Sequence, residues 1–131
     1  MRARRENKEY AVCKAIATYL RLQYPSVLFH FDLAGLNLSK AQAGMTKALN
    51  RRGWPDLIIC EPSRTGKYKA LFIEIKAGDV KLFKRSGEPK SDHISEQGDM
   101  IERLSQGCYY ADFGVGLDAC IKLIENYFNI L

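Results

Sequence analysis

The sequence predicts an α/β fold in which helices flank a mixed β-sheet. Segments with helical periodicity alternate with short apolar runs of strand length. Three of these runs are followed by a predicted helix, and the fourth run comes after that helix. The chain has 131 residues, of which 47% are hydrophobic, which is enough for one modest core. We therefore expect a single domain over residues 1–131, with an αβββαβ core.

The first half of the chain is expected to begin with a helix over residues 7–23, where apolar side chains recur mostly at three- and four-residue spacing. Tyr24-Pro25 ends this helix, because the residue before a proline avoids helical geometry. Residues 27–31 favour a short strand. Residues 40–50 favour a weak helix with one apolar side, made of Ala41, Met45 and Leu49.

The second half of the chain holds the most apolar segments. Residues 56–60 form a continuous apolar run, which is typical of a strand buried on both faces. The remaining segments are expected to be a turn at 61–66, a strand at 68–76, a long, lysine-rich and mobile loop at 77–92, a helix from about 95 to 104, a strand at 108–113 and an amphipathic helix at 117–129.

Composition narrows the class of partner and the compartment. The formal charge of +5 and a pI near 9.1 favour an anionic partner such as nucleic acid. No apolar run approaches the roughly 18 residues of a membrane span, and no apolar signal core follows the basic start, so we expect a cytoplasmic protein. Four cysteines without CxxC spacing predict reduced, buried side chains rather than a zinc site (Cys13, Cys60, Cys108 and Cys120).

Charged side chains inside the strand at 68–76 point to chemistry. Because strand side chains alternate between faces, Glu74 and Lys76 share one face, roughly 7 Å apart. Glu74 lies in an apolar run, where an isolated carboxylate is costly, so it needs either Lys76 or a metal ion as a partner. The competing interpretation is an ordinary surface ion pair, since so short a pattern also arises by chance.

Pairing of the two apolar strands would bring a second carboxylate to Glu74. If they form a hairpin around residues 61–67, residues whose numbers sum to about 128 to 130 face each other, which places Asp56 opposite residues 72 to 74. Asp56, Glu74, the backbone carbonyl of Ile75 and water would form a reasonable Mg²⁺ shell. Lys76 would then orient a water molecule and offset negative charge in phosphodiester hydrolysis.

Two further polar residues lie on apolar stripes of predicted helices. Glu9 extends the core-facing stripe of the first helix, as a third metal ligand, as a group that holds water, or as a solvated glutamate that favours the helix dipole. Gln97 lies on the stripe of the helix after the lysine-rich loop. It is expected to contact Lys76 or DNA, or to cap the helix start near Ser95.

Basic clusters flank these elements, and each is either a phosphate contact or solvated surface. One precedes the Asp56 strand, and we expect it to bind DNA, as we do the cluster in the lysine-rich loop; a third lies at the chain start. His30 and Asp32 alternate on the first strand, where a structural role is favoured over a place in the site. The clusters are Lys47, Arg51 and Arg52; Lys81, Lys84, Arg85 and Lys90; and Arg2, Arg4 and Arg5.

Taken together, these segments resemble the VRR-NUC (virus-type replication-repair nuclease) family of the PD-(D/E)xK superfamily. The chain departs from commoner members at Cys13, where a glutamine often stands, and in a longer, more basic loop from Ala77 to His93. The matching pieces are Glu9 with residues 15–20, Gly53-Trp54-Pro55-Asp56-Leu57-Ile58, Phe72-Ile73-Glu74-Ile75-Lys76, and Ser95-Glu96-Gln97 ahead of residues 101–104.

The resemblance implies a restriction-endonuclease-like core, dependence on Mg²⁺ with Mn²⁺ as a substitute, and a catalytic set of Asp56, Glu74 and Lys76 assisted by Glu9 and Gln97. It also implies a homodimer in a bacterial or phage-infected cell that acts on branched DNA, especially four-way junctions. Two alternatives remain: a flap or nicking nuclease without junction preference, and a DNA-binding module whose site is silent. The intact Asp56, Glu74 and Lys76 count against the silent module.

Overall fold

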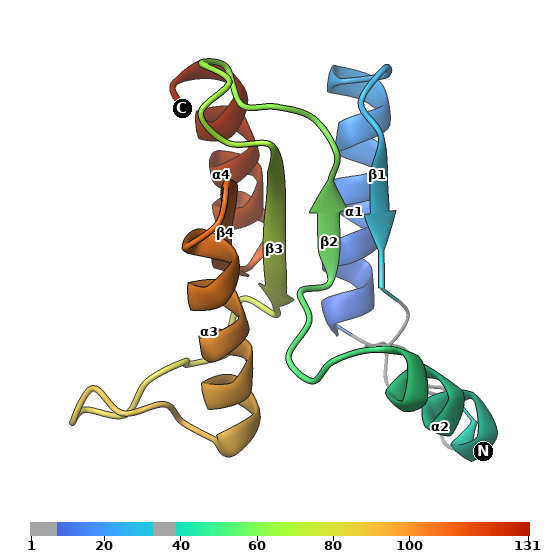
Figure 1. Ribbon diagram of the computed structural model, residues 1–131, viewed down its shortest axis with the longest axis vertical. Helices are drawn as coiled ribbons and strands as arrows, with labels where there is room; N and C mark the ends of the chain where they lie inside the picture. The colour runs from blue at the N-terminus through green and yellow to red at the C-terminus, as the bar shows by residue number, and fades with distance from the viewer. Residues whose placement is uncertain (1–7, 33–38) are drawn as a thin grey trace.

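A four-stranded mixed β-sheet forms the centre of the protein in a computed structural model that describes residues 8–32 and 39–131 (Figure 1). This arrangement confirms the predicted α/β fold and the predicted order of helices and strands. Along the chain the elements are α1 (Lys8–Gln23), β1 (Phe29–Phe31), α2 (Lys40–Leu49), β2 (Leu57–Ile59), β3 (Ala70–Lys76), α3 (Asp92–Ser105), β4 (Tyr109–Val115) and α4 (Leu117–Asn129).

The strands lie in the order β1-β2-β3-β4, with β1, β2 and β3 antiparallel and β4 parallel to β3. Every residue of β3 is buried, as expected for a central strand covered on both faces. Leu57 pairs with Ile73 and Ile59 with Leu71, so the numbers of facing residues sum to 130, within the predicted range. Asp56 therefore lies just before the paired part of β2, level with Glu74.

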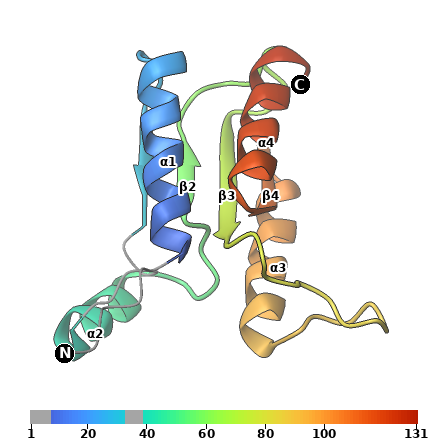
Figure 2. The ribbon, with the colours of Figure 1, turned by 180° about the vertical axis from the view of Figure 1, so that it is seen from behind.

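Helices cover the two faces of the sheet unequally. α1 and α4 pack on one face and α3 packs on the other, over β3 and β4 (Figures 1 and 2). The alternation predicted for β3 is confirmed, because its two sets of apolar side chains enter different clusters. Leu71, Ile73 and Ile75 join residues of α1 and α4, and Phe72 joins Met100 and Leu104 of α3.

The segment between β3 and α3 is a loop, as predicted, but it contains local structure that was not predicted. It folds back on itself, with a bridge between Phe83 and Pro89 and a hydrogen bond of 2.8 Å from the Lys90 N–H to the Leu82 carbonyl. α3 also begins earlier than predicted. Ser91 caps it, because the Ser91 hydroxyl accepts a hydrogen bond from the Ile94 N–H at 3.2 Å. The predicted cap near Ser95 is therefore wrong.

The prediction of buried cysteines holds only in part. Cys120 is buried and Cys13 is half-buried, and burial raises the pKa of each thiol to about 12, so both stay protonated at neutral pH. Cys60 and Cys108 are exposed, since both lie where strands begin or end. All four thiols are free. Within the described residues, no helix is both long enough and apolar enough to cross a membrane.

Helix α2 stands apart from the core. It is built locally by a capping box, in which Ser39 and Gln42 exchange hydrogen bonds of 3.1 and 3.0 Å between side chain and backbone. None of its residues is buried, and Met45 and Leu49 on its predicted apolar side are 65% and 82% exposed. α2 and the folded segment before α3 extend in opposite directions from the same end of the molecule (Figures 1 and 2).

Candidate active site

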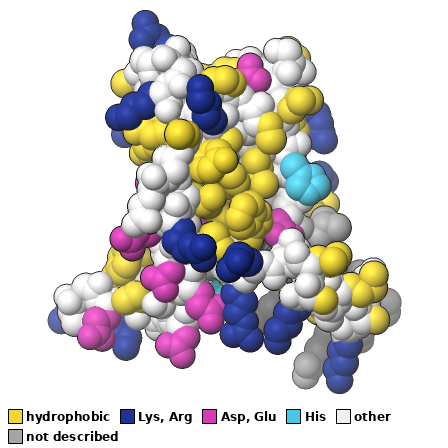
Figure 3. Space-filling model, in the orientation of Figure 1, with side chains coloured by type: hydrophobic (Ala, Val, Ile, Leu, Met, Phe, Trp, Pro, Cys, Tyr) yellow, Lys and Arg dark blue, Asp and Glu magenta, His cyan; other side chains and the backbone are white. Residues whose placement is uncertain are grey.

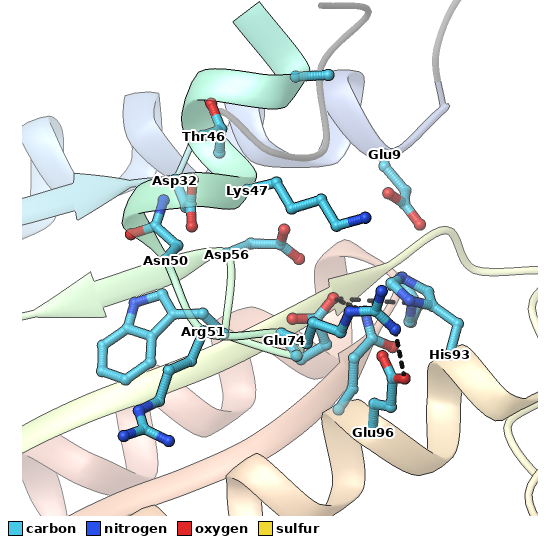
Figure 4. A pocket seen from close by; sticks show the side chains of 16 residues that line it. Glu9, Asp32, Thr46, Lys47, Asn50, Arg51, Asp56, Glu74, His93 and Glu96 are labelled. Atoms are coloured by element: carbon cyan, nitrogen blue, oxygen red, sulfur yellow. Dashed lines mark hydrogen bonds and ion pairs between the residues drawn. The ribbon is translucent and has the colours of Figure 1, made fainter.

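A cavity of about 550 Å³ lies at that end of the molecule, where β3 ends and α1 begins. α2 forms one wall, and the first turns of α3 form the opposite wall (Figure 4). The cavity is lined by Glu9, Asp32, Ala43, Thr46, Lys47, Asn50, Arg51, Arg52, Gly53, Trp54, Asp56, Glu74, Lys76, His93, Glu96 and Gln97. The predicted catalytic residues Asp56, Glu74, Lys76, Glu9 and Gln97 are thus brought together in one place.

Asp56 is held at the cavity by the sheet itself. Its carbonyl accepts a hydrogen bond of 2.7 Å from the Asp32 N–H, which extends the pairing of β1 with β2. Its side-chain Oδ2 accepts a bond of 2.8 Å from the Ile75 N–H, beyond the last paired residue of β2. The carboxylate therefore takes the position of a backbone acceptor in the ladder, and its orientation is fixed.

Glu74 is 3% exposed, and its two oxygens have different surroundings. Oε1 accepts a hydrogen bond of 2.7 Å from Gln97 Nε2 and lies 3.7 Å from Lys76 Nζ. Oε2 is buried and has no hydrogen-bond partner among the described residues. A buried carboxylate oxygen without a partner is costly, so a donor or a cation bound at this oxygen would stabilise it.

The two carboxylates oppose each other electrostatically. Burial and then the neighbouring Asp56 carboxylate raise the pKa of Glu74 to about 9, and Lys76 opposes this rise only in part. Burial also raises the pKa of Asp56, against the lowering effects of a side-chain hydrogen bond from protonated Glu74, of the Ile75 N–H and of Lys76. Two buried carboxyls with raised pKa values, next to one ammonium, are an environment that a bound cation would stabilise.

The donor set fits a hard cation such as Mg²⁺, which prefers oxygen ligands and keeps several waters. Within the described residues, no group of three or more His, Cys, Asp or Glu side chains could hold a metal ion. A shell at this site would therefore use Asp56, Glu74, a backbone carbonyl and water. The Ile75 carbonyl is suited to this role, because in a strand the N–H and C=O of one residue point the same way, here toward Asp56.

Glu9 enters the cavity from the first turn of α1. A 2.9 Å ion pair between Lys8 and Asp79 joins the start of α1 to the segment that follows β3. Glu9 is half-buried, and burial raises the pKa of its carboxyl, with Lys76 opposing and Asp56 reinforcing the rise. Glu9 thus lies within the field of the site, and its predicted role in holding a metal or water stays a prediction.

The predicted basic clusters separate in the structure. Lys47, Arg51 and Arg52 line the cavity, with Lys47 reaching across it toward Glu9, and Lys and Arg side chains gather between α3 and α2 on the face shown in Figure 3. Arg52 also forms a 3.4 Å ion pair with Glu96. Lys81, Lys84 and Arg85 lie in the folded segment before α3, and His30 is exposed on β1, so these residues do not line the cavity. The cluster of Arg2, Arg4 and Arg5 lies outside the described residues.

Comparison with known proteins finds a similar solved structure but no match by sequence. No protein-family model matches the sequence, and neither does any curated protein. A solved structure described as a VRR_NUC domain protein superposes with a TM-score of 0.65 over 94% of this chain and 89% of its own length, at 24% sequence identity. The chain has the VRR_NUC domain fold. The family resemblance inferred from the sequence is therefore supported in its fold.

In this VRR_NUC domain fold, two wall features were missed by sequence reasoning. His93 lies on the first turn of α3, with its Nε2 3.1 Å from Gln97 Nε2. Its four-residue spacing from Gln97 would have indicated that the two side chains are neighbours on one helix. The expected helix start near residue 95 left His93 outside the helix, so this spacing was not used. Thr46 of α2 and Asn50, which caps the end of this helix, line the cavity at the same four-residue spacing, while Met45 and Leu49 are exposed.

Proposed function

We propose that this chain is a metal-dependent DNA endonuclease of the VRR-NUC family, within the PD-(D/E)xK superfamily, that hydrolyses phosphodiester bonds. The observation that supports this proposal most is that the two carboxylate oxygens of Glu74 have different surroundings. One is held by Gln97 and lies near Lys76, and the other is buried without a hydrogen-bond partner among the described residues, in a side chain that lines the cavity together with Asp56. A purely structural carboxylate would not need such surroundings.

In the proposed reaction, Asp56, Glu74 and the Ile75 carbonyl hold Mg²⁺, for which Mn²⁺ can substitute. The bound ion would polarise the phosphate and lower the pKa of a coordinated water. Lys76 is 7% exposed and lies on the Glu74 side of the cavity, so its ammonium can orient the attacking water and offset charge in the transition state. Glu9 would hold water from the first turn of α1, and Gln97 keeps Glu74 in place.

DNA is the proposed substrate because cations surround the carboxylates. Lys47 and Arg51 line the wall formed by α2 and the loop after it, close enough to the cavity to meet the phosphates that flank the scissile bond. Lys81, Lys84 and Arg85 lie on the segment that extends from the same end of the molecule on the other side. A strand bound across the cavity would meet basic side chains in both directions.

The finer proposal is that the preferred substrate is a four-way junction and that the enzyme acts as a homodimer. Two symmetric copies would place two equivalent sites on the two equivalent strands of a junction. Support for self-association comes from the outward apolar side of α2, where Met45 and Leu49 are exposed. Membrane attachment has no part in this proposal.

The test is cleavage of labelled four-way junction, flap and plain duplex with Mg²⁺ or Mn²⁺. Wild type is compared with Glu74→Gln, and Glu102→Gln on the exposed side of α3 is the matched control. We expect symmetric nicks in the junction from wild type and control, and binding without cleavage from Glu74→Gln. Equal cleavage of all three substrates would leave a nuclease without junction preference. Binding without cleavage by all three proteins would favour the silent DNA-binding module.

A further inference from the structure

The side-chain amide of Gln97 makes two contacts through the same atom. Gln97 Nε2 lies 2.7 Å from Glu74 Oε1 and 3.1 Å from His93 Nε2. An amide NH₂ group has two hydrogens and no acceptor capacity. If one hydrogen is donated to the Glu74 carboxylate, the other is donated to His93. The His93 Nε2 must then be an acceptor, which places the imidazole proton on Nδ1.

The orientation of this amide decides what Glu74 meets. In the reverse orientation, Gln97 Oε1 would face Glu74 Oε1, and the two acceptors would repel each other whenever Glu74 is ionised or carries its proton on Oε2. Gln97 is 5% exposed, and its Oε1 has no hydrogen-bond partner among the described residues, so nothing on that side of the amide fixes its orientation. The acceptor on His93 is therefore the only contact among the described residues, apart from Glu74 itself, that distinguishes the two ends of the amide.

We propose that His93 is a positioning residue for Glu74, acting through Gln97. The His93 ring, accepting at Nε2, holds the amide with its NH₂ group toward Glu74, which engages Oε1 and leaves Oε2 available to a bound cation. This inference rests on the proposed function and deepens it, by extending the site from the metal ligand through two residues of α3. Outer hydrogen-bond partners of metal ligands often change metal affinity when they are removed.

His93 is itself exposed, but its position beside Gln97 distinguishes it from an ordinary histidine on a first helical turn. His93 and Gln97 are four residues apart, so their side chains are neighbours on one side of α3. That side faces the cavity, and both residues line it (Figure 4). The second histidine of the chain, His30, is exposed on β1 and does not line the cavity, which makes it a matched control.

The test is Mn²⁺ binding to the free protein, followed by electron paramagnetic resonance. We expect His93→Ala to weaken Mn²⁺ binding by about 10-fold. His93→Gln, whose side-chain oxygen supplies an acceptor in place of Nε2, should recover binding to within about 3-fold of wild type, and His30→Ala should leave it unchanged. In a Gln97→Ala background, His93→Ala should have no further effect, because the residue through which it acts is gone.

A second measurement reads the tautomer without any metal. Nitrogen-15 spectra of the histidine rings at about pH 8 should show His93 with its proton on Nδ1 in wild type, and a changed tautomer balance in Gln97→Ala. A proton on Nε2 in wild type would overturn the inference. So would equal Mn²⁺ affinity in His93→Ala and wild type while Glu74→Gln binds poorly, although the proposed function would then stand. Absence of Mn²⁺ binding by every protein would overturn both.

Discussion

Gly53 is the residue at which the two walls of the cavity meet. Its φ is +79°, and a Cβ placed there would lie 2.6 Å from the Glu96 carbonyl oxygen and 3.1 Å from the Gln97 nitrogen. An alanine would therefore meet both a left-handed backbone and the backbone of α3. We expect Gly53→Ala to lower the free energy of unfolding in urea by about 3 kcal/mol, and to reduce cleavage by moving Gln97 away from Glu74.

Gly66 supplies the control for this prediction. Its φ of +76° is nearly the same, but a Cβ there would meet nothing within 4 Å. Gly66→Ala should cost only the conformational share, about 1 to 2 kcal/mol, and leave cleavage unchanged. If both substitutions lowered the unfolding free energy equally, the close approach of Gly53 to α3 would be unsupported.

Glu74 should make stability depend on pH when no metal is present. Its pKa is about 9 in the folded protein and near 4.5 in the unfolded chain, so the native state binds the extra proton between these values. The favourable contribution of this group is complete below about pH 4.5 and is lost as pH rises through about 9, with a slope of at most about 1.4 kcal/mol per pH unit.

The measurement is urea unfolding between about pH 5 and 9 in the presence of a chelator. Wild type should lose stability relative to Glu74→Gln as pH rises. Added Mn²⁺ should stabilise wild type more at the alkaline end, because the ion competes with the proton for the carboxylate. Parallel pH curves for wild type and Glu74→Gln would contradict the raised pKa.

At the scale of elements, the two basic segments make different predictions. Lys47 and Arg51 line the cavity, whereas Lys81 and Lys84 lie on the folded segment before α3. Replacing either pair with alanine should reduce the dependence of DNA affinity on salt, by about 0.9 in log–log slope for each phosphate that is no longer neutralised. Only Lys47→Ala with Arg51→Ala should also lower the cleavage rate at saturating DNA, since only these side chains lie beside the carboxylates.

Binding titrations from about 50 to 300 mM salt, with single-turnover cleavage at saturating DNA, separate the two effects. Lys67→Ala on the turn between β2 and β3 is a control outside both segments. An unchanged salt slope after the Lys81→Ala and Lys84→Ala changes would mean that this segment is solvated surface.

Much of the fold could be predicted because periodicity reports burial directly. The run through Phe72, Glu74 and Lys76 indicated the faces of β3, and the hairpin rule placed Asp56 beside Glu74. The start of α3 could not be found in this way, since its cap lies in a polar stretch and its first buried residue is Ile94. That error concealed His93. Cys60 and Cys108 were misjudged because apolar sequence neighbours do not show which way a side chain faces at the end of a strand.

At the scale of the whole molecule, the proposed dimer predicts that each copy of the chain cuts one strand of the junction. Size-exclusion chromatography with light scattering should give twice the chain mass of 14.9 kDa. A mixed dimer of wild type and Glu74→Gln should nick one junction strand only, because each copy carries a complete set of the described site residues. A monomeric mass, with both strands still cut, would rule the dimer out.

The hydrogen bond from the Ile75 N–H to the side chain of Asp56 affects which site residues related proteins would keep during evolution. The Asp56 carboxylate serves both the sheet and the proposed chemistry, whereas the Lys76 ammonium makes no hydrogen bond of the sheet and offsets the charge of Glu74, itself a residue of the proposed site. A lineage that lost cleavage would still be under selection to keep the aspartate. We therefore expect inactive descendants to replace Lys76 and Glu74 before they replace Asp56. An aspartate at this position is therefore a poor marker of catalytic activity, and the glutamate and lysine together are a better marker.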